Sequence, residues 1–446
     1  MFHERFFFVS NFNRKTFVII SIIITLLVIE NVDSIVADFL VGFNTSDAGI
    51  TLYTIISIGY IIGQFFLLKL MDSISHAIKA RSILIASFHR MVSIVQYVLA
   101  GNVILILIQI FVLSKYSIMS LIFVSYVVNF FTAVLFIIFA LRFVSWYLNQ
   151  KHNLGVLLYA LSFLILTVIQ VMTGFGNSYL LSQKDEFITP ESTVQFNDFP
   201  EGSFFDIFYS YAYYLDYASF VLTLLASALL LYHYSKKINA RKLVLILVLP
   251  ILSYTGKILD ALNIYNTDTN PDLFFYYIFQ SLSAIVAGFL FAISFWFIAR
   301  RLPESSVKNF LIITSLGFVL LYISNHAGVN PAPYPPFGIN SLSLLPLSAY
   351  FVLFGLYSSA LSLSQDITLR QHLRSIAKND NNLLSSIGTA QMEREVNRAV
   401  GELKDVADEH EKELAEKTGI ETPVPESEIE DYLKQVIEEV SKARKK

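Results

Sequence analysis

The sequence predicts an all-α, polytopic membrane protein with about ten transmembrane helices and a cytoplasmic helical or coiled-coil tail. Of its 446 residues, 55% are hydrophobic and only 15% are charged, whereas about a quarter of a soluble domain is usually charged. Ten stretches reach the roughly 20 apolar residues that a helix needs to cross a hydrocarbon core of about 30 Å. Basic residues also concentrate in every second connecting segment, as in multi-pass proteins.

The ten apolar stretches are continuous, which excludes the alternating pattern of a transmembrane β-barrel. The first is the weakest, because Glu30 and Asp33 fall inside it. An alternative interpretation is a signal peptide cleaved after Ala37, although a cleavage region is usually small and neutral. The predicted spans cover residues 16–36, 50–70, 91–113, 117–142, 154–175, 207–234, 243–262, 275–299, 309–327 and 341–364.

The distribution of positive charge predicts the direction of the spans. Sixteen lysine and arginine residues fall in segments on the same side of the membrane as the N-terminus. The segments on the opposite side contain only Lys115 and Lys184. Positively charged loops stay in the cytoplasm. We therefore expect a multi-pass protein of the plasma membrane whose N- and C-termini are both cytoplasmic.

Several classes of function are excluded or unsupported. The chain has no cysteine, so disulfides and thiolate metal sites are excluded. It has neither an HxxxH nor an HExxH pattern, so no metal site is predicted. A P-loop, a glycine-rich nucleotide loop and a Ser/His/Asp elbow are also missing, so we predict no catalytic residue and no cofactor. The tail after Gln365 is acidic, which argues against nucleic-acid binding.

Ionisable residues inside the predicted spans share one depth. They are costly in lipid and usually face a partner or a cavity, and all of them fall in the outer half of the membrane. Lys257 and Asp260 lie three residues apart on one helix face, so they can form a self-satisfied ion pair. Alternatively, Lys257 faces the other acids across an outward-open pocket. The candidate ligand-binding residues are Lys257, Asp260, Asp216, Glu30, Asp33, Tyr214 and His326.

Two connecting segments on the predicted outer face are a long loop and a proline-rich segment. The loop from 176 to 206 is long enough to form a lid or a hairpin over the helix ends. The segment "NPAPYPPFG" (330–338) contains four prolines, so we expect it to be stiff, extended and packed on neighbouring helix ends.

The chain divides into a transmembrane domain (1–365), a cytoplasmic helix with a coiled-coil-like seam (366–417) and a C-terminal amphipathic helix (426–446). A 4-3 apolar pattern begins at Val396. We interpret the tail as an arm that docks a cytoplasmic signalling partner or forms a homodimer; alternatively, its two helices fold on each other. The predicted docking positions are Val396, Val400, Leu403, Leu414, Leu433 and Val436.

An internal repeat is a further hypothesis. The segments "ASFVLTLLAS" (218–227) and "AYFVLFGLYS" (349–358) share the pattern AxFVLxxLxS and lie four predicted spans apart. Parallel repeats of this kind occur in transporters, whereas chance similarity in so apolar a chain is the alternative.

The segment "YPPFGINSLSLLPLSAYFVLFGLYSSALSLSQDITLRQHLRSI" (334–376), in which the last span runs into a charged helix, resembles archaeal multi-span sensory membrane proteins. The resemblance covers about a tenth of the chain. It implies that the membrane domain senses a ligand and passes a signal to the tail. The chain departs from that group because it has no kinase, cyclase or chemotaxis output domain, so the output would have to pass to a separate protein.

These observations predict a sensor or receptor-like protein that couples an outward-facing polar pocket to a cytoplasmic docking helix. Two alternatives remain: a secondary transporter of a small solute, and a non-catalytic structural subunit of a membrane complex. The ten spans and the intramembrane charges favour a transporter, whereas the confinement of those charges to the outer half argues against the midplane site usual in carriers.

Overall fold

The computed structural model describes residues 14–36, 40–79, 83–149, 153–192, 199–234, 270–303, 305–325, 332–376, 383–398 and 401. Within these residues the fold is helical apart from two strands of two residues each, as the composition predicts. The elements are α1 (Arg14–Ile35), α2 (Val41–Asn44), α3 (Asp47–Lys79), α4 (Ile83–Leu113), β1 (Tyr116–Ser117), α5 (Ile118–Asn149), α6 (Leu154–Ser182), β2 (Phe187–Ile188), α7 (Phe204–Tyr234), α9 (Asn270–Ala299), α10 (Ser306–Asn325), α11 (Ile339–Ser343), α12 (Leu345–Gln365) and α13 (Ile367–Ile376).

The chain is a multi-pass membrane protein. Eight of the described helices are long and apolar enough to cross a bilayer, and α9 adds a shorter apolar stretch, Ile285–Ala299. The outward surface of the bundle carries large apolar side chains that water would not tolerate: Phe111 is 63% exposed and Val112 is 72% exposed. Lipid is the solvent for which such a surface is suited.

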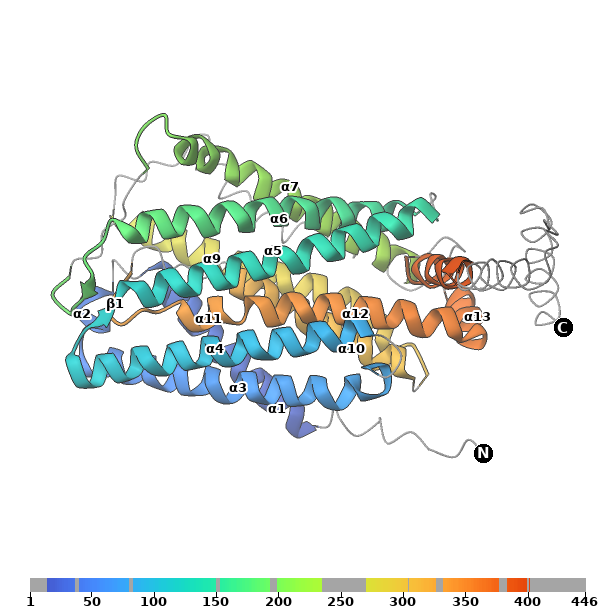
Figure 1. The fold of residues 1–446 in the computed structure, drawn as a ribbon, viewed down its shortest axis with the longest axis horizontal. Coiled ribbons are helices and arrows are strands. Elements are labelled where there is room, and N and C mark those ends of the chain that lie inside the picture. Colours follow the sequence, from blue (N-terminus) through green and yellow to red (C-terminus); the bar gives the residue numbers. More distant parts are fainter. Residues whose placement is uncertain are drawn as a thin grey trace, which may run out of the picture.

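The long helices lie alongside one another, so that the bundle has two ends (Figure 1). One end carries α2, β1, β2 and α11, and we call it the α2 end. The other carries α13 and segment 383–398, and we call it the α13 end. Because successive helices run in opposite directions, Lys115 and Lys184 lie at the α2 end, whereas Arg142, Arg300 and Lys308 lie towards the α13 end.

Helices α7 and α9 run in the same direction. Ser162 of α6 contacts Ser219 of α7 and Tyr159 contacts Ser227, so α6 and α7 are antiparallel. Similarly, α9 and α10 are antiparallel, while α6 and α10 are parallel. Because α7 and α9 are parallel, the chain has to return across the bundle between them, and one further span would be sufficient. The predicted span 243–262 lies outside the described residues, so the count of ten spans stays a prediction.

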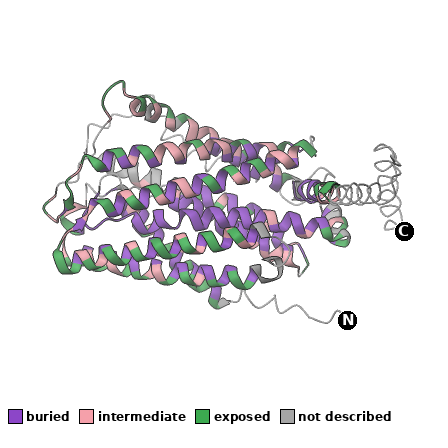
Figure 2. Cartoon of the chain, viewed as in Figure 1, coloured by how far each residue is buried: buried purple, intermediate pink, exposed green. Residues whose placement is uncertain are grey.

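Helix α12 occupies the centre of the bundle. Every residue from 332 to 356 is buried, and the buried residues concentrate along the middle of the molecule (Figure 2). The other helices therefore shield α12 from lipid, which explains how it tolerates serines at several buried positions. In such an environment the hydroxyls of Ser348, Ser359 and Ser364 bond to backbone carbonyls, as Ser359 does to Gly355 at 2.7 Å.

The tightest crossing joins α10 to α12 through two glycines. A Cβ atom on Gly317 would lie 2.8 Å from the backbone nitrogen of Val352, and one on Gly355 would meet Thr314 and lie 2.6 Å from the carbonyl oxygen of Phe310. Small residues allow backbones to approach closely in membrane bundles. A shift of α10 therefore has to move α12 as well.

The proline-rich segment enters the bundle, as far as it is described. Residues 332–338 are all buried, and the Tyr334–Pro335 peptide is cis. The hydroxyl of Tyr116 donates a 2.9 Å hydrogen bond to the carbonyl of Pro333, and burial raises the pKa of Tyr116 well above its ordinary value. Tyr116 therefore stays protonated and remains a donor. The packing agrees with the expected contact between this segment and neighbouring helix ends.

A short antiparallel ribbon closes the α2 end. Tyr116 of β1 pairs with Ile188 of β2, and the ammonium of Lys115 lies 4.1 Å from the ring centroid of Phe187. The ribbon ties the connection after α6 to the connection between α4 and α5. The predicted 176–206 loop is therefore shorter than expected, because α6 continues to Ser182.

Within the tail helix predicted for residues 366–417, the structure describes α13 and the helical segment 383–398. Asp366 is extended and separates α12 from α13. The helical segment 383–398 then packs on the bundle: the indole of Trp146 donates to Gln391 at 3.2 Å, and Asn153 donates to Ser386 at 2.8 Å. The prediction missed this docking because it placed the apolar seam from Val396 onward, whereas the buried residues include Leu383, Leu384 and Ile387.

Candidate functional site

Glu30 lies at the α2 end with no side-chain exposure. Its Oε1 accepts from the backbone N–H groups of Gly338 (3.0 Å) and Asn340 (3.1 Å) and from the Asn340 amide (2.8 Å). Its Oε2 accepts from the N–H (2.8 Å) and the hydroxyl (2.7 Å) of Ser341. Both oxygens thus accept hydrogen bonds from the start of α11, whose N-cap residue, Gly338, provides no side-chain cap.

The Glu30 carboxylate therefore caps α11 from another helix. The first N–H groups of a helix have no partner within it, and in the apolar interior an unsatisfied N–H is costly. Gly338 has φ +97°, a conformation that favours glycine and turns successive N–H groups towards Glu30. We call Glu30, Gly338, Asn340 and Ser341 the α11 clamp.

Asp33, one turn further along α1, has a separate partner. Its Oδ2 accepts a 3.1 Å hydrogen bond from the amide of Asn44, which ends the short helix α2. Asp33 thus holds the connection between α1 and α3. Neither acid of α1 lines the cavity that contains Asp216.

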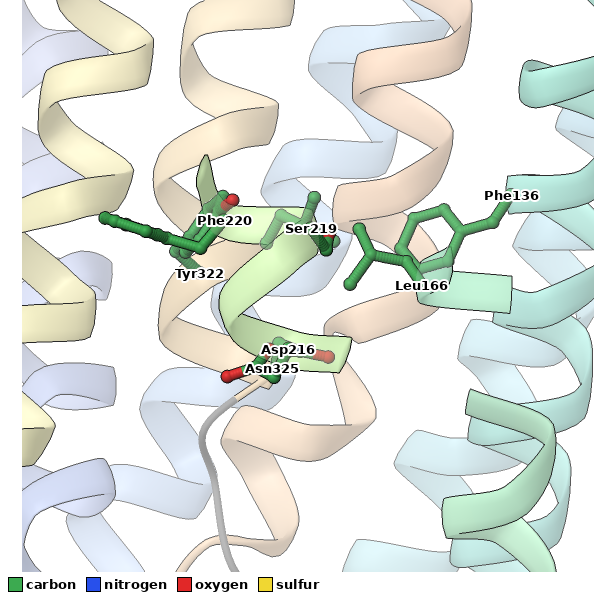
Figure 3. Close-up of a pocket in the computed structure, with 8 residues that line it drawn as sticks. Phe136, Leu166, Asp216, Ser219, Phe220, Tyr322 and Asn325 are labelled. Atoms are coloured by element: carbon green, nitrogen blue, oxygen red, sulfur yellow. The ribbon is translucent and has the colours of Figure 1, made fainter. Parts of the chain in front are cut away.

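Asp216 lines a cavity between α5, α6, α7 and α10 (Figure 3). The walls combine aromatic and aliphatic side chains with a few polar groups, the composition typical of small-molecule sites. The cavity volume is about 10 Å³, no more than a single water molecule needs. A ligand larger than water therefore requires α7 or α10 to move. The lining residues are Phe136, Leu166, Asp216, Ser219, Phe220, Leu321, Tyr322 and Asn325.

Polar contacts between helices surround this cavity. The Nε2 atom of Gln170 donates to Oδ1 of Asn325 at 2.5 Å. The hydroxyl of Ser162 lies 2.9 Å from that of Ser219 and 2.6 Å from that of Thr223. Such contacts hold membrane helices together at about 0.6 kcal/mol each on average, an energy small enough for a ligand to rearrange them.

The predicted site residues do not form one described cluster. Glu30 belongs to the α11 clamp, Asp33 contacts Asn44, and Asp216 faces the cavity. Tyr214 is 56% exposed and is not among the residues that line the cavity. Lys257, Asp260 and His326 lie outside the described residues, so their partnership stays a prediction. The docking positions Val400, Leu403, Leu414, Leu433 and Val436 also lie outside them, and Val396 is half-buried on segment 383–398.

The sequence did not indicate which groups surround the two acids. Asn325 and Tyr322 close α10 next to Asp216, and Asn340 and Ser341 meet Glu30. The segment "SNH" (324–326) shows a polar pair at the end of an apolar run, but nothing near it indicates that Asn325 pairs with Gln170 on α6. Within the described ranges, no group of three or more His, Asp or Glu residues is placed to hold a metal ion.

No family model matches the chain, and no curated protein or solved structure is similar to it. The chemistry of the site therefore rests on its own geometry. Asp216 offers a carboxylate acceptor, Asn325 and Ser219 offer amide and hydroxyl groups, and Phe220 and Tyr322 offer ring surface. A small solute that carries N–H or O–H donors complements this set.

Proposed function

We propose that the chain is a receptor-like membrane protein in which a small amine or a similar hydrogen-bond donor enters the Asp216 cavity and changes the docking of segment 383–398. The observation that carries the proposal is the α10–α12 crossing at Gly317 and Gly355. Helix α10 lines the cavity, and α12 carries the docked segment at its other end, so the two regions share one closely packed pair of helices.

The contacts of segment 383–398 supply the output. A Cβ atom on Gly388 would lie 2.8 Å from the Cβ atom of Leu363 on α12, and the hydroxyl of Ser364 lies 3.3 Å from Glu395. A shift of α12 along its axis would break this fit. Undocking would then free the tail for a cytoplasmic partner or for a second copy of the chain, as the apolar pattern of the tail predicts.

We propose further that the α13 end faces the cytoplasm of a plasma-membrane protein. Basic residues near that end, such as Arg142, Arg300 and Lys308, support the proposal, because positive loops are retained on the cytoplasmic side. Since the native chain has no cysteine, Lys115→Cys and Lys308→Cys give single labelling sites at opposite ends. An impermeant thiol reagent on whole cells should label Lys115→Cys only; labelling of Lys308→Cys alone would reverse the orientation.

Trp146 provides a native reporter for coupling. The chain has two tryptophans, so Trp296→Phe leaves Trp146, which contacts Gln391, as the only one. In proteoliposomes of this variant, methylammonium should change the fluorescence emission of Trp146. Glycerol, a hydrogen-bond donor without charge, shows whether the positive charge is needed. Asp216→Asn should abolish the response. Asp206→Asn, a matched change in the first turn of the same helix, should keep it.

A secondary transporter is the second candidate, favoured by a polar cavity enclosed between several helices. Labelled methylammonium distinguishes the two. Uptake into proteoliposomes that depends on Asp216, with no change in Trp146 emission, would support transport and overturn the receptor. A change in emission without uptake would support the receptor.

A further inference from the structure

A second set of polar side chains, all buried except Asp72, runs along the other flank of the bundle, between α1, α3, α4 and the α11–α12 pair. It shares no residue with the Asp216 cavity. We call it the polar row. Its members lie at successive depths from the α2 end to the α13 end: Glu30, Asn340, Ser57, Tyr60, Ser343, Gln96, Gln64, Tyr350, His89 and Asp72.

Direct contacts define the half of the row nearest the α2 end. The amide of Asn340, which donates to Glu30, also lies 3.1 Å from the hydroxyl of Ser57. Tyr60 is one turn further along the same face of α3 and lies close to Ser343. The Nε2 atom of Gln96 on α4 donates to the carbonyl of Ser343 at 3.0 Å.

The opposite half ends at a nearly buried imidazole beside an exposed carboxylate. The Nε2 atom of His89 lies 3.6 Å from Oδ1 of Asp72, whose side chain is 57% exposed. The ring of His89 packs against that of Tyr350, with centroids 5.9 Å apart. Tyr350 and Arg142 also line a cavity of about 20 Å³. Imidazole is the side chain that exchanges protons most readily near neutral pH.

The row extends over most of the membrane. Ser57 and Asp72 are fifteen residues apart on α3, or about 22 Å at 1.5 Å per residue, within a hydrocarbon core of about 30 Å. The order of depth is the same on the three elements: Ser57, Tyr60 and Gln64 on α3; Gln96 and then His89 on α4; Ser343 and then Tyr350 on the α11–α12 pair.

Several of these polar atoms have no protein partner within hydrogen-bonding geometry, although they are fully shielded. They are the hydroxyls of Tyr60 and Tyr350, both amide atoms of Gln64, and Oε1 of Gln96. Tyr60 faces Ser343 but lies beyond hydrogen-bonding geometry. Buried polar groups are almost always satisfied, and a water molecule that bonds to about three of them is the usual means. Water molecules bonded to these atoms would satisfy them.

We propose that the polar row is a path for protons between the His89–Asp72 pair and Glu30. A proton from the α13 side binds the His89 imidazole. It then passes along water and the tyrosine hydroxyls, each O–H bond breaking as the next one forms, until the Glu30 carboxylate becomes a carboxylic acid. The imidazole ends neutral. Glu30 then releases the proton to the α2 side through Asp33, which lies one turn further along α1 and interacts electrostatically with Glu30, so charge and protons balance without another reactant.

Arrival of the proton would loosen the α11 clamp. A protonated carboxyl has one O–H donor and less acceptor capacity, so it cannot keep all five hydrogen bonds from Gly338, Asn340 and Ser341. The ionisable groups around Glu30 are Asp33 on α1 and Tyr53 and Tyr60 on α3. Those around His89 are Asp72 and Tyr350, with Arg142 across the Tyr350 cavity.

Proton flux tests the proposal. The full chain in proteoliposomes with an internal pH dye and a potassium diffusion potential should acidify or alkalinise the lumen faster than protein-free vesicles. Gln64→Leu removes two water-binding atoms and should reduce the flux to the level of protein-free vesicles, as should His89→Leu. Asn129→Leu is the matched amide control, because Asn129 bonds only within α5, and its flux should equal that of the unmodified chain.

A second measurement covers the case in which Gln64→Leu does not fold. Hydroxyl radicals formed from internal water oxidise adjacent tyrosines, so Tyr60 and Tyr350 of the unmodified chain should be oxidised despite their burial. Oxidation without proton flux would leave a hydrated row that does not conduct and would overturn the proposal. Flux that follows sodium rather than pH, or that persists in His89→Leu, would overturn it as well.

Discussion

The Glu30 carboxylate receives both the backbone N–H and the hydroxyl of Ser341, at 2.8 Å and 2.7 Å, across 311 positions of sequence. A single acid on α1 thereby supplies the cap that α11 lacks and fixes the start of the central helix pair. The carboxylate is tolerated in the membrane because five donors surround it, and these donors are tolerated because the carboxylate satisfies them.

Glu30→Leu should therefore be among the most destabilising single changes in the chain. It leaves the N–H groups of Gly338, Asn340 and Ser341 buried without an acceptor, at an expected cost of about 3–5 kcal/mol. Ser57→Ala removes only one contact of the Asn340 amide and should cost about 1 kcal/mol. The free energy of unfolding in mixed detergent micelles measures the loss of stability in both variants. Equal stability of the two variants would contradict the role of the clamp.

Gly355→Ala should separate α10 from α12. The added Cβ meets Thr314 and the carbonyl of Phe310, and backbone atoms cannot move aside as a flexible side chain can. We expect a loss of about 1–3 kcal/mol, as for other overpacked sites. Gly101→Ala is the control: a Cβ there contacts nothing within 4 Å, so the change should stabilise α4 by up to about 1 kcal/mol. Thermal unfolding of the two variants should move in opposite directions.

The contact between Asn153 and Ser386 should couple the tail to α6. Asn153 both caps α6, by accepting from Val156 at 3.3 Å, and donates to Ser386 at 2.8 Å. Asn153→Ala should cost about 0.5–2 kcal/mol through the cap and also release segment 383–398. Ser386→Ala should affect only the release. The rate of proteolysis within residues 377–398 gives the docking energy of each variant and of the double variant.

A double-mutant cycle isolates the shared contact. If the hydrogen bond couples the two residues, the changes in docking energy should depart from additivity by about 0.5–1.5 kcal/mol. Additive effects would mean that the tail docks through its apolar residues alone, such as Leu384 and Ile387.

The sequence predicted the features that depend on a single helix. The length of the apolar stretches predicted the eight described spans, and the distribution of basic residues between successive connections agrees with their antiparallel order. It did not predict features that depend on pairs distant in the chain. Glu30 was expected to face a pocket, because nothing near residue 30 indicates that residues 338–341 will turn their N–H groups towards it. The docking of segment 383–398 was missed for the same reason, since Trp146 and Asn153 lie more than 230 positions away.

Asp366 makes the start of α13 sensitive to pH. Its Oδ1 accepts from the N–H of Leu369 at 2.9 Å and from the hydroxyl of Thr368 at 2.7 Å. Partial burial acts to raise the pKa of Asp366, but these hydrogen bonds and the nearby Arg370 outweigh it and hold the pKa below its ordinary value. The cap is thus stronger when Asp366 is ionised. Its contribution is complete above the unfolded pKa of about 4 and is lost as the pH falls through the lower, folded value.

A spin label on Gln371→Cys measures this dependence, because Gln371 is exposed on α13 and the chain has no other cysteine. Label mobility should stay low at neutral pH and rise below about pH 4. Asp366→Ala should raise it at every pH, since loss of a helix cap costs about 1 kcal/mol. Asp366→Asn keeps a capping oxygen but not the charge, so it should preserve order at neutral pH and remove the transition. A transition that persists in Asp366→Asn would assign the acid sensitivity to a group other than Asp366.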